Sequence, residues 1–296
     1  LDTWNHAFGS TLGGENATFM RNLWANNAGR NPSIGWNGTF NFANNVVFNW
    51  VHRSTDGGDY KATFNIINNY YRPGPLTPQT PLAYRILKPE SGRSKLPYVV
   101  FGRAYVTGNI VHGNEKVTAD NWNGGIQVEG KDGELMDFNS AKQYFAAMKV
   151  NKPFPMAKIS LLPADQAFNY VLNNAGASLP KRDPVDTRVM EQVRTGNINP
   201  LKDVKVPATQ FKHRRLPIDS YKGGIITDIS QVGGYPEYKG TPYKDTDKDG
   251  MPDAWETKNG LNPKDASDAS ADKNNDGYTN IEDYLNSVVT LATVKP

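Results

Sequence analysis

The first half of the chain carries the hydrophobic pattern of short β-strands. Four segments, at residues 19–24, 42–48, 64–71 and 105–111, alternate apolar with polar positions and contain aromatic or β-branched side chains. Such alternation predicts half-buried strands. Each segment also contains an asparagine, and the intervals between these asparagines are 23, 24 and 40 residues, for Asn22, Asn45, Asn69 and Asn109.

The asparagine spacing indicates a repeating structure. The first two intervals match one coil of a parallel β-helix, and the third matches one coil plus an insertion in the proline-rich stretch 73–81. Equivalent positions of successive coils stack about 4.8 Å apart, so asparagines can form a ladder of side-chain hydrogen bonds. Coincidence among frequent asparagines is the alternative. With the strand pattern added, the sequence predicts a solenoid, which is a mainly β fold.

The pattern changes from about residue 138. Apolar residues then recur at helical spacing over 138–148, 162–172 and 186–194, which predicts three helices packed on the solenoid. Residues 195–243 are rich in proline, glycine and lysine and are predicted to be mostly loop. We therefore expect a β-helix domain over residues 1–240, with the helical and loop region 138–240 packed on it, and a separate module over residues 241–296.

The two ends of the chain differ in charge. Residues 244–296 contain six lysines and eleven acids, a net charge of −5, so the total of +3 leaves +8 for the rest. A basic body suits an anionic partner, either nucleic acid or an acidic polysaccharide. The basic residues are scattered apart from the cluster 213–215, which argues against nucleic acid. The chain has no cysteine, which excludes disulfides and thiol catalysis, and no apolar run long enough to span a membrane.

The acidic tail contains two copies of the twelve-residue calcium loop, at residues 245–256 and 272–283. Each copy has oxygen-bearing residues at the ligand positions, glycine at position 6, and a residue at position 7 that offers its carbonyl. The predicted ligands are Asp245, Asp247, Asp249, Met251, Asp253 and Glu256 in the first loop, and Asp272, Asn274, Asp276, Tyr278, Asn280 and Asp283 in the second. We predict a small α module, EF-hand-like, that holds two structural Ca²⁺ ions. A dockerin-like module that binds a partner is the alternative.

The stretch 26–36 is the candidate place for the chemistry. Arg30 lies between Gly29 and the pair Asn31-Pro32, with a strand-like run on either side. Pro32 fixes its own φ and favours an extended Asn31. We therefore expect Arg30 on a defined turn that enters a strand, with its side chain held. A purely structural arginine on a turn is the alternative.

With these pieces placed, the chain resembles the C-terminal part of a bacterial pectate lyase of polysaccharide lyase family 1. The resemblance is carried by residues 29–32 and by segments that span most of the chain, at 44–50, 56–59, 68–74, 175–183, 193–196 and 232–238. It implies a right-handed parallel β-helix that is secreted, periplasmic or at the bacterial cell surface. It also implies cleavage of polygalacturonate, the acidic polysaccharide of pectin, by calcium-assisted β-elimination.

The resemblance also implies roles for particular residues. Arg30 matches the arginine that removes the proton at C5 as a Brønsted base, while Ca²⁺ and cationic side chains bind the uronate carboxylate. The candidates for substrate binding are His6, Asn27, Arg53, Lys61, Arg72, Arg85 and Lys88. Two departures stand out. Ser33 and Gly35 replace further arginines, and the acids that hold the catalytic Ca²⁺ are expected upstream of this chain.

The chain begins with Leu1 and shows no signal peptide, which indicates a processed chain or a fragment. A first coil without a neighbour would expose a strand edge. We therefore expect further coils from an N-terminal fragment or a companion chain. Two other functions stay open on this fold. One is a non-catalytic pectin-binding module. The other is a polygalacturonase-type hydrolase, which needs paired carboxylates, whereas the coil region 17–114 has few acids, namely Asp56, Asp59 and Glu90.

Overall fold

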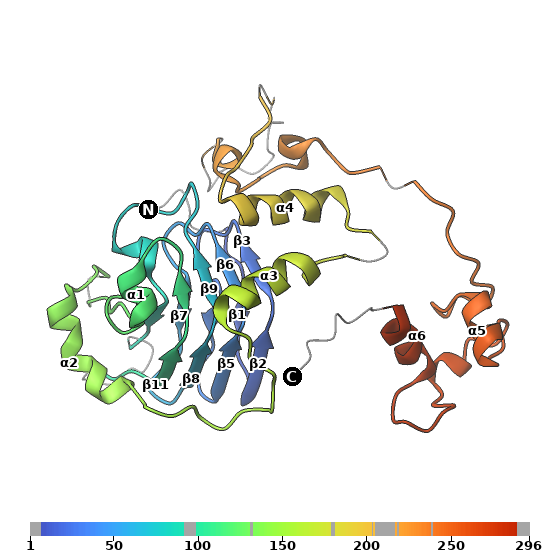
Figure 1. The fold of residues 1–296 in the computed structure, drawn as a ribbon, viewed down its shortest axis with the longest axis horizontal. Coiled ribbons are helices and arrows are strands. Elements are labelled where there is room, and N and C mark those ends of the chain that lie inside the picture. The colour runs from blue at the N-terminus through green and yellow to red at the C-terminus, as the bar shows by residue number, and fades with distance from the viewer. Residues whose placement is uncertain are drawn as a thin grey trace, which may run out of the picture. The chain divides into compact units, whose positions relative to one another are not determined.

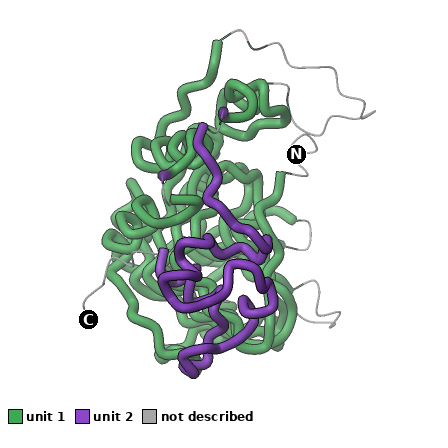
Figure 2. The backbone as a smooth tube through the Cα atoms, turned by 90° about the vertical axis from the view of Figure 1, so that its right-hand side faces the viewer, with its two compact units in different colours: residues 1–178, 182–236 green, residues 179–181, 237–296 purple. Residues whose placement is uncertain are grey.

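The computed structural model of the protein describes residues 7–91, 99–130, 133–178, 181–202, 204, 217, 219–237 and 239–288. The chain divides into two compact units, which are coloured separately in Figure 2. The first unit comprises residues 1–178 and 182–236, and the second comprises residues 237–296 with the short segment 179–181. Each unit is described by itself below.

Three parallel four-stranded sheets form the body of the first unit. Figure 1 shows their strands stacked coil upon coil. The first sheet has the order β1 (Thr11–Leu12), β4 (Ser33–Ile34), β7 (Thr55–Gly57) and β10 (Leu87–Pro89). The second has β2 (Asn16–Met20), β5 (Thr39–Ala43), β8 (Thr63–Ile67) and β11 (Arg103–Thr107), and the third has β3 (Leu23–Ala25), β6 (Val46–Phe48), β9 (Tyr70–Arg72) and β12 (Ile110–Val111). Consecutive strands visit the three sheets in turn, so the predicted parallel β-helix is confirmed.

The core of the first unit lies between the three sheets. The register pairs Phe40 with Phe64 and Phe42 with Ile66, so apolar side chains of neighbouring coils lie above one another. All four are at most 2% exposed. The rings of Phe19 and Phe40 continue the stack, with their centroids 5.3 Å apart. Because a shift by one residue would turn these side chains outward, the buried stack fixes the register of the coils.

The asparagine ladder is confirmed and is longer than predicted. Each Nδ2 donates to the Oδ1 of the next member, over 3.1 Å from Asn22 to Asn45, 3.1 Å from Asn45 to Asn69 and 2.8 Å from Asn69 to Asn109. Asn109 donates in turn to Asn121 over 2.9 Å. Buried amides are costly when unpaired, and the ladder pairs them at the corner between the second and third sheets.

Helices flank the coils. The helix predicted over 138–148 is α2 (Phe138–Met148), which contacts β11, and α3 (Ala164–Asn174) lies against β6 and β9. Helix α4 (Pro184–Thr195) begins after the N-cap Asp183, and Pro184 suits its first turn. Helix α1 (Glu115–Ala119) was not predicted. The predicted loop region contains only short 3₁₀ turns in its described part, η4 (Ser220–Gly223) and η5 (Ile229–Val232), and another, η2 (Pro81–Tyr84), precedes β10.

The second unit is small and helical. It contains α5 (Asp253–Asn259), the 3₁₀ turn η6 (Asp268–Ser270) and α6 (Asn280–Val288). The Trp255 and Tyr284 rings meet edge to face, with centroids 5.4 Å apart, and join the two helices. Lys273 donates to the Asn259 carbonyl at the end of α5 over 3.0 Å. Each of the two helices begins within one of the predicted calcium loops.

Candidate functional site

Three arginines occupy equivalent positions on successive coils, just before the strands of the first sheet. Ser33 pairs with Asp56, and Thr55 pairs with Leu87. Counting back from these pairs places Arg53 beside Arg30 on one coil and beside Arg85 on the other. We call Arg30, Arg53 and Arg85 the arginine column. Since neighbouring coils are about 4.8 Å apart, the column concentrates positive charge along one edge of the sheet.

Arg30 is held although it is partly exposed. Its backbone is left-handed, with φ of 57°, and the following Asn31–Pro32 peptide bond is cis. The Cζ atom of the guanidinium lies 4.4 Å from the centroid of the Phe8 ring. This is a cation–π contact. Arg30 therefore lies on a turn that enters β4 with its side chain held, as the sequence predicted. The contact with the Phe8 ring was not predicted.

Two asparagines support the turns that carry Arg30 and Arg53. Asn31 is fully buried, and its Nδ2 donates to the Arg53 carbonyl over 2.9 Å. Asn27 donates to the Asn31 Oδ1 over 3.0 Å. These bonds tie the two turns together across neighbouring coils. Asn27 was predicted to bind the substrate. In this structure it is hydrogen-bonded to Asn31, which in turn holds the Arg53 turn.

His52 reports the electrostatic effect of the column. Its ring meets the Phe8 ring edge-on, with centroids 5.9 Å apart. Burial lowers the pKa of His52 to about 4, and the charges of Arg53, Arg85 and Arg30 act in the same direction, against Glu129. The imidazole is therefore neutral at pH 7, and all three arginines influence it. Arg53 pairs with Asp56 over 3.2 Å and keeps 34% of its side chain exposed.

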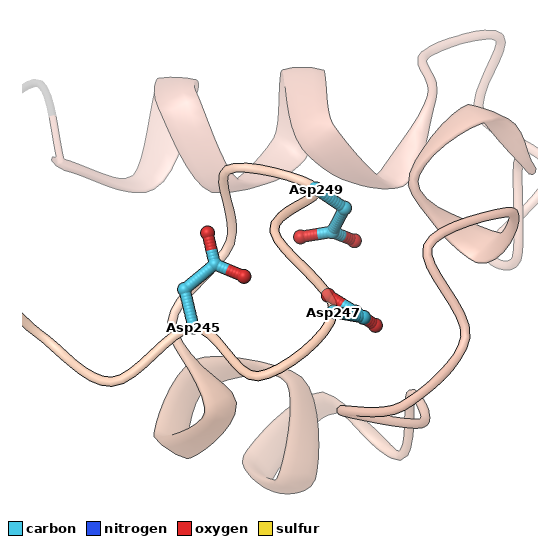
Figure 3. Close-up of side chains that lie close together, drawn as sticks. All are labelled: Asp245, Asp247 and Asp249. Carbon is cyan, nitrogen blue, oxygen red and sulfur yellow. The ribbon is translucent and has the colours of Figure 1, made fainter.

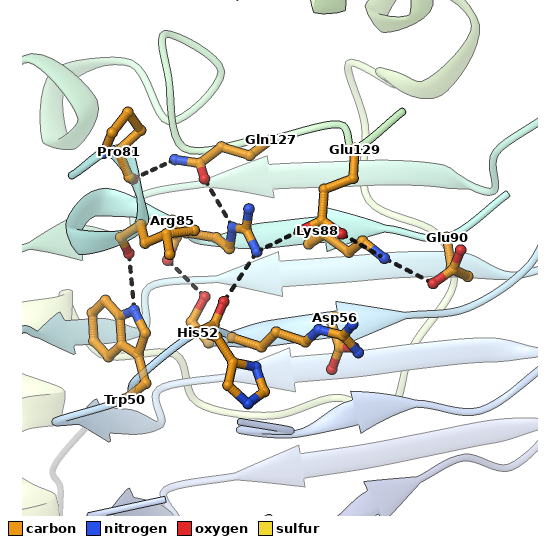
Figure 4. Close-up of polar contacts among 12 residues, drawn as sticks. Trp50, His52, Asp56, Pro81, Arg85, Lys88, Glu90, Gln127 and Glu129 are labelled. Carbon is orange, nitrogen blue, oxygen red and sulfur yellow. Dashed lines mark hydrogen bonds and ion pairs between the residues drawn. The ribbon is translucent and has the colours of Figure 1, made fainter. Parts of the chain in front are cut away.

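Arg85 and Lys88 are buried in an ion-pair network (Figure 4). Arg85 is 1% exposed, and it donates to Gln127 over 2.8 Å and to Glu129 over 3.0 Å. Lys88 pairs with Glu90 over 2.8 Å and with Glu129 over 3.3 Å. Arg85 and Lys88 were both predicted to bind the substrate. That prediction is not supported for these two, because neither side chain reaches solvent and both already have carboxylate partners.

The remaining predicted cations lie away from the column. Arg72 ends β9 on the third sheet, and its Cζ lies 5.9 Å from the centroid of the Phe168 ring of α3. Lys61 is exposed before β8, with its Nζ 5.7 Å from the Tyr60 ring centroid. His6 and the basic cluster 213–215 lie outside the described residues. Of the predicted substrate-binding cations that the structure describes, only Arg53 is both next to Arg30 and open to solvent.

A cavity of about 570 Å³ lies beside β3, and its lining includes Arg21, Asn27 and Asp186 but no member of the arginine column. Its charged groups already have partners. Arg21 donates to the Ser160 carbonyl over 3.0 Å, and Asp186 accepts from the Ala177 backbone over 2.7 Å. The cavity therefore offers little free charge to an anionic ligand, and the column is the better candidate surface.

The first predicted calcium loop gathers three carboxylates, those of Asp245, Asp247 and Asp249 (Figure 3). Ligand oxygens of the three lie within 4.8 Å of one another. Asp245 also accepts from the Gly250 backbone over 3.1 Å, and Gly250 has a φ of 97° that suits glycine. These groups are the hard oxygen donors that Ca²⁺ prefers. The residues present therefore fit a calcium ion.

Position 9 of the first loop differs from the prediction. Asp253 accepts from the Thr246 backbone and hydroxyl, each over 2.7 Å, and pairs with Lys244 over 2.8 Å. The hydrogen bonds to Lys244 and then to Thr246 lower the pKa of Asp253 to about 2. Its carboxylate fastens the start of the loop and does not join the acid group. Glu256 at position 12 does approach Asp249, together with Asp268.

The second loop brings together part of its predicted ligand set. Asn274 donates to Asp276 over 3.1 Å and to Asp283 over 2.8 Å, so these three side chains converge. Asp272 accepts from the Gly277 backbone over 3.0 Å. Asn280 is buried, its Nδ2 donates to the Asp268 carbonyl over 2.7 Å, and its Oδ1 accepts from the Lys273 backbone over 3.2 Å. Both ends of this amide thus have protein partners, and its role as a ligand stays a prediction.

Four residues of these sites were not singled out from the sequence: Phe8, Asn31, His52 and Asp268. Asn31 stood within the quoted motif, so its position was a usable signal. Phe8 and His52 reach Arg30 across coils, and no local pattern reports such contacts. Asp268 lies outside the twelve-residue calcium loop, so matching the sequence to that loop pattern does not identify it.

Comparisons with curated proteins give one consistent result. The chain is 30% identical over 289 residues to a protein named probable pectate lyase C from Aspergillus fumigatus (strain Af293), covering 92% of this chain and 53% of that protein. Proteins of the same name match at 30% identity in Aspergillus flavus, with the same coverage, and at 29% in Emericella nidulans, with 92% and 52% covered. The chain spans about half the length of these relatives. They are fungal, so they support the likeness to pectate lyases but no bacterial source.

No model of a known protein family matches the chain. Within the part of the chain that the structure describes, we find no helix with the length and apolar character needed to cross a membrane.

Proposed function

We propose that this chain is the part of a pectate lyase that carries the general base and part of the substrate-binding surface. The observation that carries the proposal is the arginine column, in a chain that is similar over 92% of its length to proteins named probable pectate lyase C. Polygalacturonate presents a carboxylate on every sugar unit. Within the column, Arg53 is the partly exposed cation beside Arg30 and can meet one of these carboxylates. Arg85 is buried and paired with Glu129.

The proposed reaction is a β-elimination with Arg30 as the base. The neutral guanidine form of Arg30 takes the proton from C5 of a uronate and becomes a guanidinium. The electron pair of that bond forms a double bond between C4 and C5, and the C4–oxygen bond breaks. The oxygen leaves with the neighbouring sugar unit and takes up a proton from solvent. Arg53 lies next to Arg30 and is 34% exposed, so it is placed to meet the uronate carboxylate. Binding that carboxylate favours loss of the C5 proton.

The catalytic Ca²⁺ of the resemblance is not assigned to these residues. When bound, such an ion would withdraw electron density from the uronate carboxylate. Among the described residues, the acid groups that could hold a metal all lie in residues 245–268. Near the column, Asp56 pairs with Arg53, and Glu129 pairs with Arg85 and Lys88. The proposal therefore routes no step through a metal at this site.

The second unit is proposed to be a calcium-stabilised module with one ion in each loop. The grouped carboxylates of the first loop support this assignment most directly. Because the substrate is a cell-wall polysaccharide, we also propose that the protein acts outside the cell. The partner is then an acidic polysaccharide, and nucleic acid is not expected.

The proposal is tested with the protein that contains this chain, polygalacturonate and calcium, by following the ultraviolet absorbance of the unsaturated product. Arg30→Lys is expected to lower kcat by about 10²- to 10⁴-fold, the usual contribution of a general base. Arg21→Lys is the matched control, because Arg21 is also a left-handed arginine with φ of 60° but lies elsewhere. Binding without product would favour the non-catalytic module, and saturated reducing ends would favour the hydrolase. Either result would contradict the proposed lyase activity.

A further inference from the structure

Several carboxylate oxygens of the second unit are buried without any partner. Glu256 is fully buried, and neither of its side-chain oxygens has a hydrogen bond. Both oxygens of Asp247, one of Asp249 and one of Asp268 are in the same state. An unpaired buried carboxylate is strongly unfavourable. The group therefore needs a compensating cation.

Asp268 belongs to this group although it lies outside the loop. It begins η6, twelve residues after Glu256. Its Oδ2 accepts from the Asn262 backbone over 2.9 Å, while its Oδ1 is buried and unpaired. Ligand oxygens of Asp249, Glu256 and Asp268 lie within 4.8 Å of one another. Two ligands of one Ca²⁺ ion, each about 2.3–2.6 Å from it, lie at most about 5 Å apart.

We propose that Asp268 is a ligand of the cation held by the first loop. The site then has five carboxylates, from Asp245, Asp247, Asp249, Glu256 and Asp268. That number favours Ca²⁺ over Mg²⁺, which is usually bound through one or two carboxylates and several waters. The inference rests on the proposed calcium module and adds to it a ligand that the loop frame does not contain.

The proposed ligand also connects the two loops. The Asp268 carbonyl accepts from the Asn280 side chain over 2.7 Å, and the Ala271 carbonyl accepts from the Asn280 backbone over 2.7 Å. Asn280 is part of the second loop and begins α6. A cation bound to Asp268 would therefore hold η6 in place, and the second loop begins two residues after the end of η6. The first site is thus positioned to order the second.

The test uses the full chain and terbium(III), which takes the oxygen ligands of calcium and emits when a nearby tryptophan is excited. Trp255 lies in the first loop and is the only tryptophan after residue 122. Its ring also contacts Tyr284 beside the second loop, so the emission reports binding to the second unit, and the two variants identify the site. Asp268→Asn is expected to weaken terbium binding, and calcium competition, at least tenfold, since even outer partners of a metal contribute about 10- to 100-fold. Asp265→Asn is the matched control. It removes the same charge from the same segment, but the Asp265 side chain accepts from the Ser267 backbone and hydroxyl and is not one of the grouped acids.

Thermal unfolding separates a ligand from a merely structural residue. Without metal, Asp268→Asn should raise the midpoint of the calcium-sensitive transition, because it removes one of several repelling carboxylates. With calcium it should lower that midpoint. A lowering under both conditions, or equal affinity losses for Asp268→Asn and Asp265→Asn, would overturn the inference but leave the calcium module. Absence of terbium and calcium binding in the unaltered chain would overturn the module as well.

Discussion

The guanidinium of Arg30 lies over the ring of Phe8, with its Cζ atom 4.4 Å from the ring centroid. This contact fixes the direction of a side chain whose backbone is strained. The strain, roughly 1–2 kcal/mol, and the cation–π contact, about 0.5–1 kcal/mol at an exposed site, nearly offset each other. Arg30 therefore contributes little to stability while remaining in a defined position.

The first prediction follows from this balance. Arg30→Asn should change the free energy of unfolding by less than about 1 kcal/mol, because relief of the left-handed strain offsets the lost contact with Phe8. The same variant should lose lyase activity. Urea unfolding and product absorbance measure the two effects. Arg21→Asn, with equal backbone geometry, serves as the control that keeps activity. Unfolding destabilised by more than about 2 kcal/mol would instead show that Arg30 is mainly structural.

The second prediction concerns the asparagine ladder. The Asn69 Oδ1 accepts from the Asn45 backbone and side chain, and its Nδ2 donates to the Phe42 carbonyl and to Asn109. Asn69→Ala leaves several buried groups unpaired, at about 1–3 kcal/mol each. We expect a loss of roughly 2–4 kcal/mol in the free energy of unfolding. Exposed Asn151→Ala should cost less than about 0.5 kcal/mol. Equal effects of the two variants would refute a stabilising ladder.

The ladder and the column show how far sequence reasoning extends. The asparagine intervals of 23 and 24 residues were visible because those coils lack insertions. Asn121 follows Asn109 by only 12 residues, after a short helix, and therefore has no repeat signal. The arginines are 23 and 32 residues apart. Whether the three arginines align depends on the point in each coil at which extra residues are inserted. That point is known only from the pairing of the strands.

The residues of the candidate sites were likewise only partly predictable from the sequence. The loop frame supplied Asp245, Asp247 and Asp249 because their spacing is local. It could not supply Asp268, whose approach to Glu256 depends on how η6 packs in the second unit. Arg85 and Lys88 were predicted to bind the substrate because they are cations on the following coils, and their burial argues against direct contact. Charge is read from the sequence, whereas solvent access is a property of the folded chain.

The third prediction is a pH dependence of stability at His52. The pKa of His52 is lowered from 6.5 to about 4 in the folded protein, chiefly by burial and then by the column arginines. Between these values the unfolded chain binds the proton more readily, so stability falls as the pH drops from about 6.5 towards 4. It is unaffected above that window. In His52→Gln this part of the dependence should disappear. Urea unfolding at pH 7 and pH 4.5 gives the comparison, and identical pH slopes for both proteins would contradict the assignment.

The last prediction contrasts two arginine–glutamate pairs of similar length. Arg85 and Glu129 are 3.0 Å apart, with 1% and 16% of their side chains exposed. Arg194 and Glu191 are 2.9 Å apart, but 52% and 54% exposed. Removing Arg85 leaves Glu129 with Lys88 alone, at 3.3 Å, and breaking a buried pair costs about 3–5 kcal/mol, so we expect a loss towards the lower end of that range. An exposed pair contributes about 0.2–1 kcal/mol.

Double-mutant cycles with Arg→Gln and Glu→Gln test this contrast. Arg85→Gln alone should be strongly destabilising, and adding Glu129→Gln should recover part of the loss, because the buried carboxylate is then neutral. The coupling at Arg194 and Glu191 should stay below about 1 kcal/mol. If Arg85→Gln left stability unchanged and instead raised the KM for polygalacturonate, Arg85 would face the substrate, and its position as a buried partner of Glu129 would be wrong.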